Sequence, residues 1–279
     1  MTDNTFDFPI YYEQNLLTDA MTENLSLTRY AIVDGQPDKS KPAMTTDAGM
    51  VFIRQGVTNW VVDSTNKTGL QSGAEFPHKV TVKAEWLSAT EALKENVKVV
   101  AGSDGNVFGS MGALLVPDDF KIPAVVADQE NIKHYNLQLI KNGDVLAVES
   151  PEVDLLMLEY DYTSIYREEF LMKEHGGGGV FVEYHNFPHI HIPMEESCGG
   201  YIVIGKNNGD DTFDFTAYQI PYGYALYTPA NTIHGDGTLV GKYGLALADS
   251  QMISANTVLI YNKNTETMAK NIVPDWPQS

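Results

Sequence analysis

Short apolar runs separated by glycine and proline extend through most of the chain. Residues 80–84 (VTVKA) alternate apolar and polar side chains, and residues 145–148 (VLAV) do so in part, whereas residues 201–204 (YIVI) are continuously apolar. Alternation with a period of two is typical of a strand with one buried face, and a short continuous apolar run is typical of a strand buried on both faces. The pattern therefore predicts an all-β protein.

Helical patterns are few. The clearest covers residues 88–96, where Ser88 can cap the first turn and Glu91 follows three residues later, an arrangement typical of a capping box. A second helix is predicted over residues 161–173, and it ends before four consecutive glycines at residues 176–179. Because glycine has no Cβ to restrict its backbone, we interpret this run as a flexible loop.

The spacing of these elements predicts three parts. Residues 1–50 form an irregular N-terminal arm, residues 51–160 a β domain without histidine clusters, and residues 161–279 a histidine-rich β domain. In the alternative organisation, the strands of the middle part extend the sheets of a single large barrel. At 279 residues the chain is long enough to bury a substantial core in either case.

Charge and cysteine content limit the function classes. Thirty-seven acidic and 18 basic residues give a net charge of −19, which repels nucleic-acid phosphates and anionic lipid headgroups. The single cysteine, Cys198, excludes an intramolecular disulfide and a cysteine-rich zinc site. The N-terminus lacks a signal-peptide pattern, and no apolar run approaches the ~20 residues that span a bilayer. We therefore expect a cytoplasmic protein with no nucleic-acid or membrane partner.

Five of the seven histidines fall within residues 175–234. His189 and His191 are two residues apart, so on a strand their imidazoles lie on the same face, about 7 Å apart at Cα, and can share one metal ion. Glu196 follows five residues later and can add a carboxylate oxygen. Pro188 is expected to interrupt the strand before this pair, which places His185 at the rim of the site. His175, beside the glycine run, is interpreted as an exposed loop residue.

A second segment strengthens the metal hypothesis. Residues 220–234 (IPYGYALYTPANTIH) contain Gly223, then Pro229 after five residues, and then His234. Together the two segments resemble the cupin superfamily, whose motifs are G-x5-H-x-H-x(3,4)-E-x6-G and G-x5-P-x-G-x2-H-x3-N. The chain departs from these motifs at three positions. Glu183 replaces the first glycine of the first motif, Gly205 comes later than that motif's final glycine, and Asn231 replaces the glycine after Pro229 in the second motif. Asparagine tolerates positive φ, so the last replacement is mild.

The resemblance implies a cupin-type double-stranded β-helix barrel, a variant of the jelly roll. It implies that His189, His191, Glu196 and His234 bind one divalent transition metal, with Fe, Mn, Ni, Co and Zn all compatible with imidazole and carboxylate donors. A second, degenerate barrel without metal is expected over residues 51–160, which would make the chain a bicupin. We also expect a homodimer, because sheet edges are commonly covered by a partner.

The function expected from this site is a metal-dependent enzyme acting on a small polar metabolite such as a sugar or keto acid. A metal-bound hydroxyl or carbonyl group is more acidic, so Glu195 or Glu183 can move a proton between carbons in an isomerase reaction. The layout is similar to the uronate isomerase branch of the cupins. A metal-dependent dioxygenase and a non-catalytic small-molecule-binding cupin fit the same residues, and the sequence leaves all three open.

Overall fold

The structure is a computed structural model of the chain that describes residues 28–45, 48–49, 68–69, 79–97, 111–150, 152–163, 165–172, 177–248 and 255–273. It divides into two compact units. The first comprises Met1–Pro77 and Gln129–Gln138, and the second comprises His78–Asp128 and Leu139–Ser279. The boundary expected near residue 160 falls inside the second unit.

The first unit contains a β hairpin within the range expected to be an irregular arm. Its strands are β1 (Thr28–Val33) and β2 (Gln36–Thr45). Asp34 and Gly35 join them with φ values of 51° and 78°, and positive φ at both central residues is what a type I′ hairpin turn requires. The unit also contains β3 (Ala48–Gly49), β4 (Thr68–Gly69) and the short 3₁₀ helix η2 (Lys133–Tyr135).

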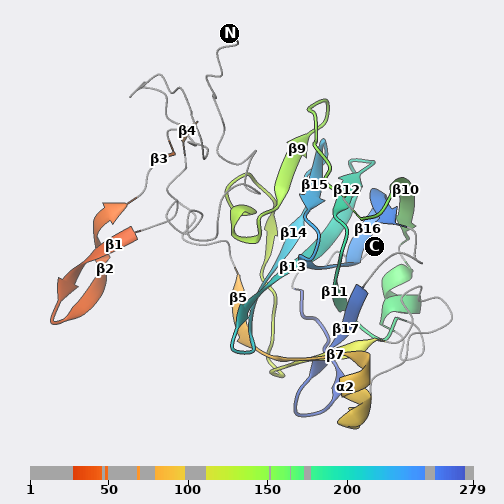
Figure 1. Cartoon of the computed structure of the whole chain (residues 1–279), viewed down its shortest axis with the longest axis horizontal. Coiled ribbons are helices and arrows are strands. Elements are labelled where there is room, and N and C mark those ends of the chain that lie inside the picture. Colours follow the sequence, from red (N-terminus) through yellow and green to blue (C-terminus); the bar gives the residue numbers. More distant parts are fainter. Residues whose placement is uncertain are drawn as a thin grey trace. The chain divides into compact units, whose positions relative to one another are not determined.

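The second unit is built on one large, mostly antiparallel sheet, consistent with the predicted all-β class (Figure 1). Its main path runs in the order β5, β14, β13, β16, β11, β17, β7 and β6. The strands that precede the histidine-rich region are β5 (Val80–Lys83), β6 (Glu85–Leu87), β7 (Gly112–Val116), β8 (Ala124–Val126), β9 (Gln138–Lys141) and β10 (Leu155–Tyr162). The later strands are β11 (Phe181–His185), β12 (His189–Pro193), β13 (Gly199–Gly209), β14 (Thr212–Gln219), β15 (Tyr224–Thr228), β16 (Ile233–Ala248), β17 (Ala255–Asn262) and β18 (Thr267–Met268).

The strand predictions at residues 80–84 and 201–204 are confirmed. The first corresponds to β5, and the second lies in β13, where Ile202, Val203 and Ile204 are fully buried. The prediction at residues 145–148 is wrong. This segment follows a turn and forms no strand, and Val145 is 92% exposed. Partial alternation over four residues is too short a signal to place a segment in a sheet.

The predicted capping box is confirmed. Helix α2 (Ala89–Lys94) begins after Ser88, whose hydroxyl accepts a hydrogen bond from the Glu91 N–H, while the Glu91 carboxylate accepts one from the Ser88 N–H. Figure 1 shows α2 beside β7. The helix predicted over residues 161–173 is confirmed only in part, because β10 continues to Tyr162 and the helical turn is the π-helical segment η3 (Tyr166–Leu171).

The long strand β16 organises the region of interest. Its first half pairs with β11 and β13, and its second half pairs with β10 and β12. One strand thus brings together segments from both sides of residue 160. In the described part of the chain, the main path ends at β5 and β6 without pairing between them. The cupin jelly roll and the second barrel stay predictions.

None of the helices within the described ranges combines the length and apolar character needed to cross a membrane.

Candidate metal centre

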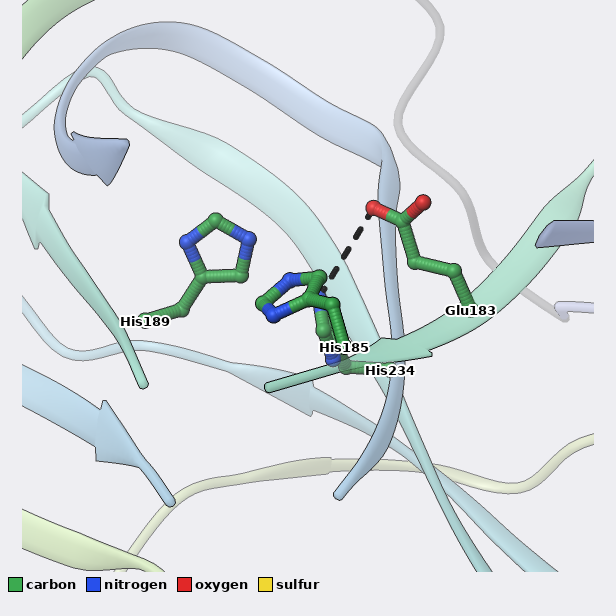
Figure 2. Close-up of side chains that lie close together, drawn as sticks. All are labelled: Glu183, His185, His189 and His234. Atoms are coloured by element: carbon green, nitrogen blue, oxygen red, sulfur yellow. Dashed lines mark ion pairs between the residues drawn. The ribbon is translucent and has the colours of Figure 1, made fainter. Parts of the chain in front are cut away.

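Strand pairing gathers four potential metal ligands in the interior of the second unit. Glu183 on β11 lies directly opposite His234 on β16. His185 follows Glu183 by two residues and therefore lies on the same face of β11, and β12 contributes His189. Figure 2 shows the Glu183 carboxylate pointing toward His234, with the three imidazoles gathered beside it. One ligand atom from each residue lies within 4.8 Å of all the others.

The Glu183–His234 distance suits a single ion, while the 4.8 Å limit of the whole group is a few tenths of an ångström wider than two metal–ligand bonds span. Glu183 Oε1 lies 3.8 Å from His234 Nε2, and two donors about 2.0–2.2 Å from one ion are at most about 4.4 Å apart. The ring centroid of His185 lies 4.6 Å from that of His189 and 4.7 Å from that of His234. His189 and His234 are also separated by 4.7 Å. All four residues are at most 4% exposed, so the donors are held in fixed positions away from bulk water.

Backbone and side-chain hydrogen bonds orient the donors. His189 Nδ1 lies 2.7 Å from the Ala246 carbonyl oxygen, and His234 Nδ1 lies 2.8 Å from the Thr232 carbonyl oxygen. Since a carbonyl oxygen only accepts, each Nδ1 carries the proton and each Nε2 keeps its lone pair. Glu183 Oε2 accepts a hydrogen bond from the Thr257 hydroxyl at 2.7 Å. This is the usual way in which proteins fix metal-binding imidazoles and carboxylates.

Three nitrogen atoms of the group lack hydrogen-bond partners. His234 Nε2 and both ring nitrogens of His185 are buried without a hydrogen bond. Most buried polar atoms in proteins are hydrogen-bonded, because leaving one unpaired costs roughly 1–3 kcal/mol. Three such nitrogen atoms beside a carboxylate therefore fit a transition metal ion, for which imidazole and carboxylate are suitable ligands.

Burial sets the protonation of the histidines. It lowers the pKa of His185 to about 3, with the charge of His234 as a second cause. Burial also lowers the pKa of His189 and of His234. The three imidazoles are therefore neutral at pH 7, which is the form that binds metal.

The carboxyl group of Glu183 is shifted in the opposite direction. Burial raises its pKa to about 7, and the charge of Asp236 raises it further, while the hydrogen bond from Thr257 opposes the shift. A bound cation favours the carboxylate form of Glu183, and its attraction for the carboxylate compensates the cost of burying that charge.

A second carboxyl group lies near the four ligands. Asp236 follows His234 by two residues on β16, where the pairing with β13 is irregular, and its charge acts on both Glu183 and His234. Asp236 accepts a 2.6 Å hydrogen bond from the Tyr162 hydroxyl on β10. Burial raises the pKa of Asp236 and that of Tyr162. The site therefore contains a polar pair that is distinct from the four ligands.

The sequence-predicted residues divide into two groups. His189 and His234 lie together as expected, and Glu183, expected to act as an acid or base, is one of the four residues that could hold a metal ion. His185, expected at the rim, completes the group. The strand is interrupted as expected, since β11 ends at His185 and β12 begins directly after Pro188, but the chain returns so that His185 and His189 face each other. Glu183 and His185 are two residues apart, as His189 and His191 are. This spacing was the sequence feature that could have identified Glu183 and His185 as a second pair of ligands.

Three other predicted residues lie outside this group. His191 is fully buried, with its ring centroid 5.2 Å from that of His189. Glu195 and Glu196 are exposed in the turn that follows β12, and Glu195 lies 3.6 Å from Lys242 Nζ. Because β12 ends at Pro193, this turn carries both carboxylates into solvent. His175 lies outside the described residues.

No family model, curated protein or solved structure matches this chain.

Proposed function

We propose that this protein is a metal-dependent enzyme that acts on a small polar metabolite. Glu183, His185, His189 and His234 would bind one divalent transition metal. The observation that supports this most is the convergence of four buried ligand atoms within 4.8 Å of one another. The order and spacing of His189 and His234 relative to the cupin motifs add to it, although Glu183 and His185 take the place of Glu196 and His191 as ligands.

A purely structural role for the four residues explains the site less well. Ile204 on β13 lies directly opposite His234 and is fully buried, so apolar side chains suit this environment. Three imidazoles and a carboxylate in their place lose hydration without regaining all their hydrogen bonds. A bound cation offsets that loss, and metal binding then contributes to folding stability.

When bound, a divalent ion polarises the hydroxyl and carbonyl oxygens of a substrate, and four protein ligands leave up to two octahedral positions for it. The chain supplies the proton-transfer groups. As a metal ligand Glu183 would stay ionised, which leaves the nearby Asp236 as the carboxyl group for proton transfer. Asp236 accepts a hydrogen bond from the Tyr162 hydroxyl, and its charge acts on both Glu183 and His234. Carboxyl groups of this kind favour proton transfer between carbons, so we place isomerase chemistry ahead of the dioxygenase alternative.

Metal content tests the first part of the proposal. The full chain, purified without a histidine tag, is expected to contain about one equivalent of a transition metal by elemental analysis. His234→Ala and His185→Ala should each lose it. His134→Ala removes a histidine of the first unit and is the matched control, which should retain the metal. Full metal content in His185→Ala would refute the ligand set derived from the structure.

Solvent exchange tests the reaction type. An isomerase incorporates deuterium from D₂O at a substrate carbon, which NMR detects with a panel of aldoses, ketoses and hydroxy acids. Exchange at an undiminished rate under strict anaerobiosis supports the isomerase. Oxygen consumption that requires the metal supports the dioxygenase instead. Binding without either, unchanged in a His189→Ala and His191→Ala double variant, supports a non-catalytic binding protein.

A further inference from the structure

Two buried polar side chains beside the candidate metal centre have no hydrogen-bond partner. His191 is fully buried, and neither of its ring nitrogens is paired. The hydroxyl oxygen of Thr228, which is 1% exposed, is also unpaired. Unpaired buried polar atoms are uncommon in folded proteins and point to a ligand that pairs with them.

Strand register places both side chains on the face that carries the metal ligands. Thr228 on β15 lies directly opposite His189 on β12, so the two side chains share one face of the sheet. His191 follows His189 by two residues and lies on that same face. The partners of His191 in the neighbouring strands are Leu226 and Leu245, whose side chains offer no hydrogen bond. A molecule held at the metal centre is therefore the available partner for both residues.

The chemistry of these two residues defines what they recognise. The His191 imidazole is fully buried, and in its neutral form it offers one N–H donor and one lone pair. The Thr228 hydroxyl both donates and accepts. Two groups that each donate and accept are complementary to hydroxyl groups, which do the same.

No positively charged side chain is buried in the described part of the chain to pair with a phosphate group. The charged residues that are buried in the described part of the chain are Glu183 and Asp214, with no lysine or arginine among them. A phosphate group carries close to two negative charges at pH 7 and binds where arginine, lysine or a helix N-terminus compensates them. The net charge of −19 adds to the repulsion.

We propose that His191 and Thr228 form a subsite that binds the hydroxyl groups of a neutral polyhydroxy metabolite, such as an unphosphorylated sugar, held at the metal centre. This inference rests on the proposed function, because the ion anchors the ligand beside the two residues. It assigns His191 to the substrate, whereas the cupin resemblance implies a metal ligand at this position.

The test uses the full chain loaded with Co²⁺, whose visible absorption reports both occupancy and the coordination of added ligands. Hydroxyacetone is the probe, since it is neutral and carries adjacent hydroxyl and carbonyl oxygens. We expect it to shift the Co²⁺ spectrum with saturation. Thr228→Val and His191→Phe should each raise its Kd about tenfold while about one Co²⁺ per chain is retained. Any response to inorganic phosphate, which can bind Co²⁺ directly, should be the same in wild type and in His191→Phe.

Thr238→Val is the matched control. Thr238 is as deeply buried as Thr228, but its hydroxyl donates a 2.5 Å hydrogen bond to the Tyr201 carbonyl oxygen. Its replacement should lower the Tm and leave the Kd for hydroxyacetone unchanged. Thr228→Val should raise the Tm without the probe, because it removes an unpaired hydroxyl at nearly constant volume. This thermal readout does not depend on the metal.

The outcomes separate this inference from the proposed function. Wild-type chain that binds no Co²⁺ refutes the metal centre itself. Loss of Co²⁺ from His191→Phe makes His191 a metal ligand and refutes the subsite. An unchanged Kd in both variants, or no response of the Co²⁺-loaded wild type to hydroxyacetone, also refutes it. A phosphate response that disappears in His191→Phe would refute the preference for neutral ligands.

Discussion

Replacing Gly235 by alanine should separate the two strands that bring Glu183 and His234 together. Gly235 follows His234 on β16, where a Cβ atom would lie 2.1 Å from the Phe181 carbonyl oxygen of β11. Ordinary contacts of this kind begin at 3.4 Å, so the strands must move apart by roughly 1 Å or more. Because the obstacle is backbone, no side-chain rotation relieves it.

The displacement translates into a loss of metal affinity. Glu183 Oε1 and His234 Nε2 are 3.8 Å apart, and one more ångström exceeds the ~4.4 Å that two metal–ligand bonds can span. Gly235→Ala should therefore weaken metal binding by about 10–100-fold, the range seen when the supports of metal ligands are altered. Overpacking should also lower the free energy of unfolding of the metal-free chain by about 1–3 kcal/mol.

Metal competition with a chromophoric chelator gives the affinity, and urea unfolding of the metal-free chain gives the stability. Gly237→Ala is the control on the same strand. There a Cβ would approach the ends of side chains, Phe181 Cε1 at 2.9 Å and Leu171 Cδ1 at 3.3 Å, which can move. Its metal affinity should stay within a few-fold of wild type. Wild-type affinity in Gly235→Ala would show that the close pairing of β11 and β16 does not position the ligands.

Three further predictions concern stability. The metal-free chain should lose stability as the pH falls from about 6.5 toward 3. In the folded chain the pKa values of His185 and His191 are about 3, so in this pH range both imidazoles bind protons only when the chain unfolds. Each imidazole contributes roughly 1.4 kcal/mol per pH unit in that window. Glu183 opposes this loss of stability between about pH 7 and 4.5, because its raised pKa means that the folded chain binds a proton there that the unfolded chain does not. Urea titrations should therefore show the steepest loss of stability below about pH 4.5. Constant stability across that range would contradict the assignment of neutral imidazoles. Lys79→Met removes the ion-pair partner of the buried Asp214 carboxylate, which keeps its hydrogen bond from the Thr81 hydroxyl, and should lower the free energy of unfolding by about 3 kcal/mol. An equal loss in Lys263→Met, which breaks an exposed ion pair, would show that burial is irrelevant. Ser88→Ala removes the cap of α2 and should cost about 1 kcal/mol in the same assay, and Ser88→Thr should restore most of it.

Local patterns in the sequence were sufficient where neighbouring residues determine the structure. The capping box at Ser88 and the buried strand at residues 201–204 depend on spacing within a few positions. The positive φ expected at Asn231 is also present, at 64°. The pair formed by His189 and His191 lies on one strand face for the same reason.

The composition of the site depended on contacts between distant strands. Glu183 and His234 are 51 positions apart, and only the pairing of β11 with β16 brings them opposite each other. His185 joins the group because the chain reverses between β11 and β12, which the sequence marked only by Pro188. Glu196 has the spacing of a cupin ligand, but the end of β12 at Pro193 leaves it in an exposed turn. Motif spacing does not report where a strand ends.

The exposed strand β10 affects how this protein behaves at high concentration. Leu156, Met157 and Leu158 are between 38% and 62% exposed, and among the described strands β10 pairs only with β16. An apolar edge of this kind is a template on which other chains can add strands, and Glu159 and Asp161 are the charges that oppose such stacking. Colloidal stability should therefore depend on ionised carboxylates, so acidification removes the barrier to precipitation at the same time as it weakens the fold.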